Sequence, residues 1–282
     1  MNNQIYKDRK IVLLTKHKKE EVIKPILEEA TGCSVIVETR FDTDKLGTFA
    51  RDVERTKSQL DTARLKIEIG MELSNTDIGI ASEGSFGSHP YIPIPWNVEI
   101  VLLYDKRENF EIYGVCENGE TNFDHITTDK FDDVINFANK IGFPEHYLII
   151  RPDNSSSNQV IKGINNYDWL KEAFDLCLSN SKSGNVFLET DMRAHANPTR
   201  MKNIKKATED LISKLNKCCP NCGAPGFVVS EVEKGLPCEL CNLPTERILK
   251  NISKCYRCSY IREEMYPKGN TASAQYCNYC NP

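Results

Sequence analysis

Residues 10–38 read KIVLLTKHKKEEVIKPILEEATGCSVIVE, and this stretch decides how the chain begins to fold. Lys10–Leu14 and Ser34–Glu38 are short apolar or β-branched runs, which are typical of buried strands. The pattern between them is helical; Pro25 begins or kinks the helix, and Gly32 ends it. Two strands joined by a helix usually pair in parallel through a right-handed crossover. We therefore expect an α/β fold.

The loop after the first strand reads TKHKK, from Thr15 to Lys19. Folds of the α/β class commonly bind ligands at the carboxyl ends of their strands, and lysines suit a phosphate. We expect Thr15, Lys16 and Lys18 to bind the phosphate of a small ligand. The alternative is that these lysines are ordinary solvated surface residues.

Carboxylates flank a long helical pattern in the next stretch, Phe41–Gly87, which reads FDTDKLGTFARDVERTKSQLDTARLKIEIGMELSNTDIGIASEGSFG. Apolar residues recur every three or four positions from Phe49 to Leu73 and predict one helix. Asp77–Ala81 then reads as a buried strand, and Glu83 follows in a Ser/Gly-rich turn.

The carboxylates of this stretch are the candidate catalytic groups. Asp52 and Glu54 fall in the first turns of the predicted helix, where acidic side chains also stabilise the helix dipole. Carboxylates gathered in one site need a cation, and oxygen ligands suit Mg²⁺ handling phosphates. A helix of 25 residues spans roughly 37 Å, so only tertiary folding can bring Glu83 and the earlier acids together. We predict Glu83, Asp52 and Glu54 as catalytic residues, with Mg²⁺ as their cofactor.

The middle of the chain continues the mixed α/β pattern. The prolines of His89–Pro95 exclude a regular helix or a central strand. Asn197 is a suitable N-cap, and Pro198 suits the first position of the helix that leads to the cysteines. Between these points we expect an antiparallel hairpin of Val98–Tyr104 and Phe110–Cys116, further strands at Tyr147–Arg151 and Asn185–Leu188, and helices at Phe131–Lys140 and Tyr167–Leu178.

Cysteines dominate the last 65 residues. Eight of the chain's 12 cysteines form four C-x-x-C pairs: Cys219/Cys222, Cys238/Cys241, Cys255/Cys258 and Cys277/Cys280. Two pairs together supply the four thiolates of a tetrahedral zinc site with no open position, so we predict two structural zinc sites. Sequential pairing into two tandem zinc ribbons is the simplest arrangement; a cross-braced arrangement, the first pair with the third, remains open. Disulfide bonds between these cysteines are the competing interpretation, but such bonds occur mainly in secreted proteins.

Composition narrows the cellular setting and the partners. The N-terminal apolar run is too short for a signal-peptide core, and no apolar run could span a membrane, so we expect a cytoplasmic protein without a membrane anchor. Residues 1–197 carry 23 Lys and Arg against 32 Asp and Glu, while the cysteine-rich tail is nearly neutral with 7 against 6. This distribution argues against nucleic acid as a partner. Protein contact through the zinc ribbons, or simple extension of the domain, is the preferred role of the tail.

The chain also shows two resemblances. Its segments FDTDKLGTF, ASEGSFG, NPTRM and CPNCG resemble a family of uncharacterised domains with a cysteine-rich C-terminal tail. More remotely, residues 10–100 are similar to the inosine/xanthosine triphosphate pyrophosphatases. Thr48 and Phe49 are comparable to the Thr-Phe that leads into the metal-binding helix of those enzymes, and Asp52 or Glu54 and Lys66 to that helix's Glu and Lys. Ser82–Ser85 is comparable to their acidic turn, and Arg193 with His195 to their base-recognition turn.

The pyrophosphatase resemblance implies further site residues and a reaction. Thr48 and Ser85 would contact the substrate, and Arg193 and His195 would touch the base or sugar. Arg51 stands where those enzymes have a metal-binding Glu, and Glu83 stands alone where they have paired acids. The implied activity is Mg²⁺-dependent, pyrophosphatase-like hydrolysis of a phosphorylated small molecule, most simply a nucleotide. The alternative function is a non-enzymatic zinc-ribbon adaptor or ligand sensor.

These observations divide the chain into three parts. We expect an α/β ligand-binding or catalytic domain with a mixed sheet over residues 1–197, a connecting helix over 198–217, and two four-cysteine zinc ribbons over 218–282.

Overall fold

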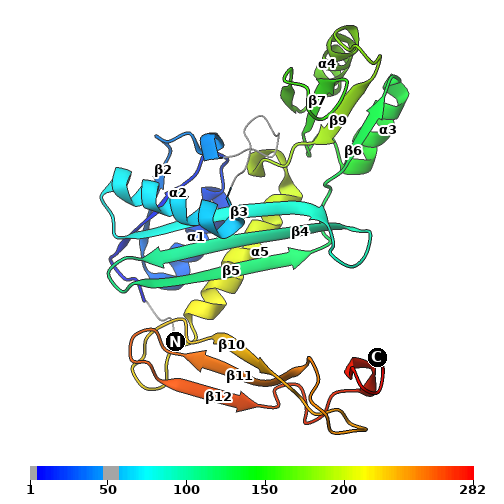
Figure 1. Cartoon of the computed structure of the whole chain (residues 1–282). Coiled ribbons are helices and arrows are strands. Elements are labelled where there is room, and N and C mark those ends of the chain that lie inside the picture. The colour runs from blue at the N-terminus through cyan, green and yellow to red at the C-terminus, as the bar shows by residue number, and fades with distance from the viewer. Residues whose placement is uncertain (1–4, 47–56) are drawn as a thin grey trace. The chain divides into compact units, whose positions relative to one another are not determined.

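The computed structural model describes residues 5–46 and 57–282 (Figure 1). The chain divides into two compact units, unit 1 from Met1 to Ile212 and unit 2 from Ser213 to Pro282. Within the described ranges, no helix has both the length and the apolar character needed to cross a membrane.

Unit 1 begins with a five-stranded mixed sheet in the order β2-β1-β3-β4-β5. β1 pairs in parallel with β2 and β3, while β3, β4 and β5 pair antiparallel. The β-α-β opening and the α/β class are thus confirmed. The elements are β1 (Lys10–Leu14), α1 (Glu20–Thr31), β2 (Ser34–Glu38), α2 (Gln59–Ser74), β3 (Ile78–Ser88), β4 (Pro95–Asp105) and β5 (Phe110–Asn118).

The two faces of this sheet are covered by different helices. The connections through α1 and α2 run across the sheet in opposite directions, so right-handed crossovers put these helices on opposite faces. α2 packs closely on its face, since a Cβ on Gly79 would lie 2.6 Å from Cγ2 of Ile67. The opposite face of β5 meets α5 (Pro198–Leu215), which lies behind the sheet in Figure 1. Asn197 caps α5, accepting a hydrogen bond from the Arg200 amide, as predicted.

A second sheet of four antiparallel strands, in the order β6-β9-β7-β8, completes unit 1. Two helices pack on it around a core that includes Val134, Phe174 and Leu188. The structure confirms the predicted helices and β7 and β9, whereas the four-residue strands β6 and β8 were not predicted. These elements are β6 (His125–Thr128), α3 (Phe131–Ile141), β7 (Leu148–Pro152), β8 (Ile161–Ile164), α4 (Tyr167–Ser179) and β9 (Val186–Thr190).

Unit 2 is a three-stranded antiparallel meander, β10 (Val229–Lys234), β11 (Ile248–Lys254) and β12 (Ile261–Met265). Every residue of β10 and β12 is exposed. A small buried cluster of Ala224 and Phe227 packs with Cys219 and Cys255 at one end. With so little apolar burial, a unit of this size needs another source of stability.

Two predictions around the acidic stretch were wrong. α2 begins at Gln59, because Ser58 has an extended backbone and its side chain accepts a hydrogen bond from the Asp61 amide. α2 is therefore 16 residues long, about 24 Å, and the part of the predicted helix at 49–56 lies outside the described residues. Glu83 lies in β3 and not in a turn, because β4 pairs with β3 along its whole length, from Ile78 to Ser88.

The contact between β5 and α5 leads to a stability prediction. A Cβ on Gly114 would lie 2.0 Å from the Ala207 carbonyl oxygen and 2.4 Å from the Leu211 amide nitrogen, so α5 must move. We expect Gly114→Ala to lower the free energy of unfolding by at least about 2 kcal/mol. The readout is urea unfolding followed by tryptophan fluorescence, since both tryptophans, Trp96 and Trp169, lie in unit 1.

The matched control is Gly87→Ala on β3, where a Cβ would meet nothing within 4 Å. We expect that change to stay within about 0.5 kcal/mol of the wild type. Equal unfolding midpoints for the two variants would contradict the close packing of α5 on β5.

Candidate functional site

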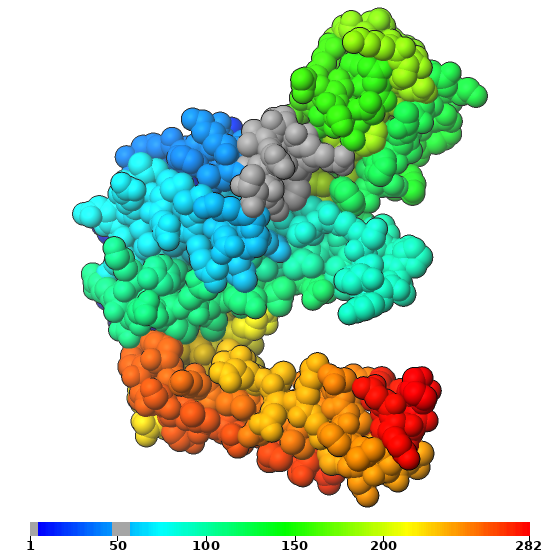
Figure 2. Space-filling view, in the orientation of Figure 1, coloured from blue at the N-terminus to red at the C-terminus, as the bar shows by residue number. Residues whose placement is uncertain are grey.

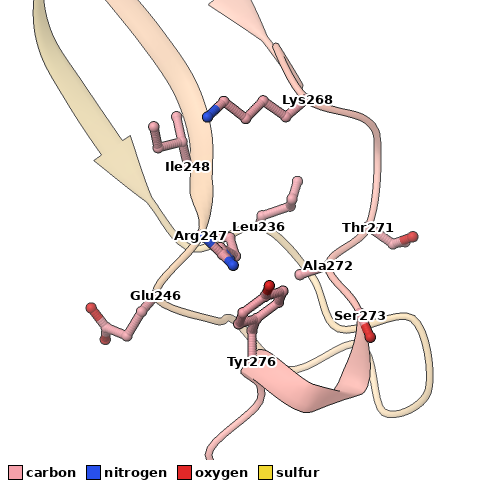
Figure 3. Close-up of a pocket in the computed structure, with 9 residues that line it drawn as sticks. All are labelled: Leu236, Glu246, Arg247, Ile248, Lys268, Thr271, Ala272, Ser273 and Tyr276. Atoms are coloured by element: carbon pink, nitrogen blue, oxygen red, sulfur yellow. The ribbon is translucent and has the colours of Figure 1, made fainter. Parts of the chain in front are cut away.

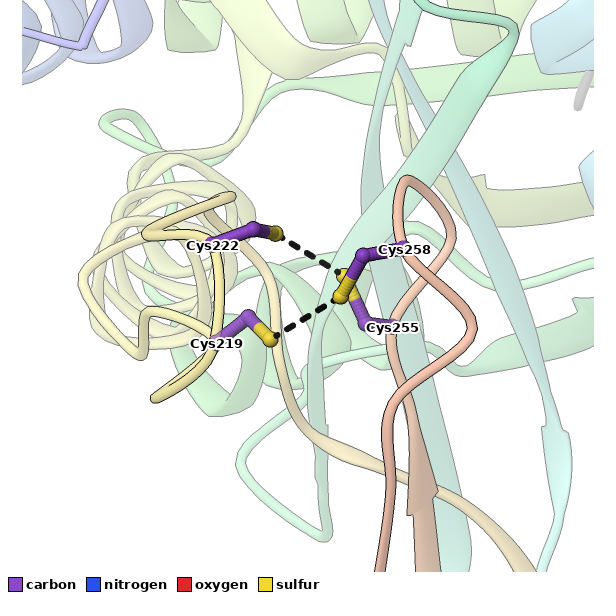
Figure 4. A group of neighbouring side chains, drawn as sticks. All are labelled: Cys219, Cys222, Cys255 and Cys258. Carbon is purple, nitrogen blue, oxygen red and sulfur yellow. Dashed lines mark hydrogen bonds between the residues drawn. The ribbon is translucent and has the colours of Figure 1, made fainter.

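Eight cysteines of unit 2 gather into two clusters of four. Within each cluster, the sulfur atoms lie within 4.8 Å of one another. In the first cluster, Cys219 Sγ lies 3.7 Å from Cys258 Sγ, and Cys222 Sγ lies 3.6 Å from Cys255 Sγ (Figure 4). The second cluster consists of Cys238, Cys241, Cys277 and Cys280. Both clusters have the ligand number and sulfur donors of a closed, structural metal site.

The pairs interleave along the chain. The first C-x-x-C pair joins the third, and the second joins the fourth, so sequential pairing was wrong and the cross-braced alternative is the arrangement found. Strand direction is the reason. β10 carries the chain away from the first pair, β11 returns it antiparallel to the third, and β12 carries it away again toward the fourth. Alternate pairs therefore share an end of the meander.

One thiol of the first cluster, that of Cys258, also accepts a hydrogen bond from outside the cluster. The side-chain amide of Asn221 donates to Cys258 Sγ at 3.4 Å. This bond is the main reason that the pKa of Cys258 falls to about 6, which favours the thiolate, the form that binds a metal. Among the described residues, the two cysteine clusters are the groups of three or more His, Cys, Asp or Glu side chains arranged to hold a metal.

In unit 1, a buried ammonium group lies at the edge of β3. β1 pairs with β3 at Val12 and Leu13 and then ends, so β3 continues without this neighbour. Lys19, the N-cap of α1, fills the gap: its Nζ donates to the Ser82 carbonyl oxygen at 2.6 Å. Burial and, next in size, the nearby Arg200 together lower the pKa of Lys19 to about 7.

Two buried ion pairs flank this lysine on opposite faces of the sheet. On the α2 face, the Lys66 ammonium pairs with the Glu83 carboxylate. On the α5 face, Arg200 Nε lies 2.7 Å from Glu99 Oε1, and both side chains are almost fully buried. We call these five residues, Lys19, Lys66, Glu83, Glu99 and Arg200, the charge cluster. With all five ionised, it carries a net charge of +1.

Several buried polar atoms beside the charge cluster lack hydrogen bonds. Asn97, on β4, is fully buried, and neither atom of its side-chain amide has a partner among the described residues. The same holds there for Glu99 Oε2 and for the hydroxyl of Thr15. Buried polar groups are almost always satisfied, so unmet groups gathered near excess charge point to water or a ligand.

The predicted phosphate loop is engaged with the acidic loop. Lys16 Nζ lies 2.8 Å from Asp42 and 3.2 Å from Asp44, and His17 Nε2 lies 2.9 Å from Asp44. The His17 ring also stacks on His195 at 5.1 Å. Burial lowers the pKa of His17 to about 4 despite Asp44, so the ring is neutral at neutral pH.

The other predicted site residues are dispersed or undescribed. Arg193 pairs with Asp191, two residues before it. Ser85 is exposed on β3, and Lys18 is exposed with a positive φ of 57°. The remaining predicted residues lie outside the described part of the chain: Thr48, Asp52 and Glu54.

Sequence reasoning missed most of the charge cluster. It named Glu83, and Lys66 through the pyrophosphatase resemblance, but not Lys19, Glu99 or Arg200 as site residues. A signal for Glu99 was present: one acid interrupts the otherwise apolar run VEIVLL, from Val98 to Leu103. A charge among residues that alternate into a core calls for a buried partner.

Cross-bracing makes a specific prediction about metal content. Cys222→Ser/Cys258→Ser damages one cluster and should leave one bound metal per chain. Cys222→Ser/Cys241→Ser damages both clusters and should leave none. Sequential pairing predicts the opposite result for the two variants, which elemental mass spectrometry of chains purified without chelator distinguishes.

The pKa of Lys19 predicts how stability depends on pH. The unfolded lysine keeps its ordinary pKa of 10.5, so the cost of burying the cation is fully present below pH 7 and disappears as the pH rises toward 10.5. Relative to Lys19→Met, the wild type should gain about 1 kcal/mol of unfolding free energy per pH unit between pH 7 and 9.5. Urea unfolding at pH 6.5, 8 and 9.5 measures this, and a constant difference would contradict it.

Comparison with known proteins gives a family. A search of curated proteins finds no match to this chain. The inosine/xanthosine triphosphate pyrophosphatases do not emerge from the comparisons, so that resemblance stays a prediction. A family model matches residues 66–282, which include β3 to β5, the second sheet, α5 and both cysteine clusters. The chain therefore belongs to the family described as a domain of unknown function, DUF6671.

Proposed function

We propose that unit 1 binds a phosphorylated small molecule of the nucleotide class at the charge cluster, and that each cysteine cluster of unit 2 holds a structural zinc ion. The observation that carries the first part is the net positive charge cluster that lies beyond the carboxyl end of β1, beside the middle of β3.

The energetics of burial support an anionic ligand. Four of the five charged residues are buried and Lys66 is mostly covered, and this is unfavourable for stability because each charge loses hydration. Groups with strongly perturbed pKa values in such places are functional-site candidates. The excess cation, Lys19, lies at the first turn of α1, where the helix dipole also favours an anion. The hydroxyl of Thr15, the residue after β1, also has no partner among the described residues.

The side chains of His17, in the Thr15–Lys19 loop, and His195 support a nucleotide as the ligand. His17 stacks on His195, which follows β9. The two neutral imidazole rings are flat and suit stacking with a base. The buried Nδ1 of His195 has no partner among the described residues and suits a hydrogen bond to the base or the sugar. The pyrophosphatase resemblance implies the same role for His195.

Hydrolysis with Mg²⁺ is the finer and more demanding part of the proposal. Mg²⁺ binds carboxylates and phosphate oxygens, and Glu83 is the described candidate ligand. Its carboxylate pairs with Lys66, so metal binding requires that this pair open. Asp52 and Glu54 remain the proposed second carboxylate.

For the cysteine clusters, zinc is the proposed metal because four thiolates in a closed site are typical of structural zinc. Eight thiolate ligands also require a reducing environment, which supports the expected cytoplasmic location.

Calorimetric titration with ATP, GTP, ITP and XTP, with and without Mg²⁺, tests ligand binding. We expect the triphosphates to bind and the corresponding nucleosides not to bind. Lys19→Met should weaken binding at pH 6.5 by at least about tenfold, since it removes a charged hydrogen-bond donor. Lys10→Met, which removes an exposed lysine at the other end of β1, should bind like the wild type. Binding of the nucleosides as tightly as the triphosphates, or wild-type affinity of the Lys19→Met variant for the triphosphates, would contradict the proposed site.

Phosphate and pyrophosphate release in the same samples separates the two candidate functions. Turnover that requires Mg²⁺ and falls in Glu83→Gln supports the hydrolase. Binding without turnover favours the alternative, a ligand sensor, which the buried pair of Glu83 with Lys66 also favours because it already neutralises the carboxylate.

A further inference from the structure

Unit 2 contains a pocket of about 360 Å³ that the cysteine clusters do not use (Figure 3). Its walls come from four places in the unit: the segment after β10, the segment that leads into β11, the segment after β12, and the short helix Ala274–Tyr276. The residues that give the pocket its charge and its apolar base are Leu236, Arg247, Ile248, Lys268, Ala272 and Tyr276.

Two cations face this pocket. The Arg247 guanidinium lies 3.3 Å from the centre of the Tyr276 ring, which fixes its plane. Lys268 extends its ammonium group toward the same space from the opposite wall (Figure 3). Within the described part of the chain, neither cation has an acidic partner. Glu246 points away from the pocket and lies 2.9 Å from Lys234.

The rest of the pocket is apolar or carries hydroxyl groups. Leu236 and Ala272 are buried at its base, and Ile248 lies beside them. Thr271 and Ser273 add hydroxyl groups at one side. An occupant therefore needs a negative group for the two cations and an aliphatic group for the base.

The second cysteine cluster holds the walls of the pocket together. Cys238 forms a β-bridge with Ala272, and the Glu239 amide donates to the Ala272 carbonyl oxygen at 2.9 Å. Tyr276 directly precedes Cys277 of the same cluster. Two walls of the pocket are therefore tied to the second cysteine cluster.

Exposed apolar residues on the same cluster favour a protein over a metabolite. Leu240, between Cys238 and Cys241, is 72% exposed, and Tyr279, between Cys277 and Cys280, is 74% exposed. The C-terminal residues, red in Figure 2, lie on the surface at one end of unit 2. A partner that fills the pocket could also cover these side chains, and aromatic residues are typical of protein interfaces.

We propose that this pocket binds a protein segment in which an Asp or Glu side chain stands next to an aliphatic residue. The carboxylate pairs with Arg247 and Lys268, and the aliphatic side chain packs on Leu236 and Ile248. The planar Arg247 guanidinium, held on Tyr276, gives the carboxylate two parallel donors.

The test uses the full metal-loaded chain and fluorescein-labelled, amidated octapeptides in which one Asp or Glu is flanked by Leu or Ile. Each peptide has a partner in which Asn or Gln replaces the acid. We expect the acidic peptides to bind at least about tenfold more tightly than their amide partners, with affinity that falls as salt rises.

Three variants locate the binding site. Arg247→Gln should weaken binding of the acidic peptides at least about tenfold, and Arg247→Lys should recover only part of it. Lys254→Gln removes the same charge at the far end of β11 and should leave affinity unchanged. Metal content is measured for each variant, so loss of the cluster is distinguished from loss of the cation.

Several results would overturn the proposal. These are no binding by any acidic peptide, equal binding of acidic and amide peptides, or wild-type affinity of Arg247→Gln with both metals in place. Equal competition by free N-acetylglutamate amide would assign the pocket to a small molecule instead.

Discussion

The buried ion pair between Glu99 and Arg200 connects more of unit 1 than any other single interaction described above. Glu99 belongs to the middle of β4, and Arg200 to the first turn of α5. Arg200 also donates to the Met192 carbonyl oxygen, in the segment that follows β9. One guanidinium group thus links the first sheet, the helix behind it and the chain leaving the second sheet. Removing one partner of such a pair costs about 3–5 kcal/mol, because the other charge stays buried.

That pair also explains why the charge cluster can exist. Gly84 faces it on β3, and any Cβ there would lie 2.5 Å from Glu99 Oε1. The absence of a side chain leaves room for the carboxylate and the guanidinium inside the sheet. On the other face, Glu83 and Lys66 form the second pair, so Lys19 at the strand edge remains as the excess cation. Burying these charges lowers the stability of unit 1, and charged groups excluded from water are common in binding sites.

Unit 2 is stabilised by its cysteine clusters and not by buried charges or a large apolar core. Its outer strands are exposed, and its buried apolar cluster is small, so hydrophobic burial cannot hold it. Cross-bracing compensates, since each cysteine cluster joins two segments more than 30 residues apart. A metal ion bound at each cluster would offset the cost of closing such loops, and its binding would then be part of the folding energy. Because unit 2 does not depend on a large apolar core, it can expose large apolar side chains such as those of Leu240 and Tyr279.

The sequence by itself determined the local elements and the ligand groups. Period and composition identified the strands and helices of the β-α-β opening, the cap at Asn197 and the four C-x-x-C pairs, because these depend on neighbours within a few residues. The start of α2 failed because the cap at Ser58 outweighs a continuous apolar stripe. Tertiary structure alone decided which cysteine pairs meet, through the direction of β10 to β12. It also decided the charge cluster, whose members lie up to 181 positions apart, from Lys19 to Arg200, and become neighbours only when the sheet and its helices pack.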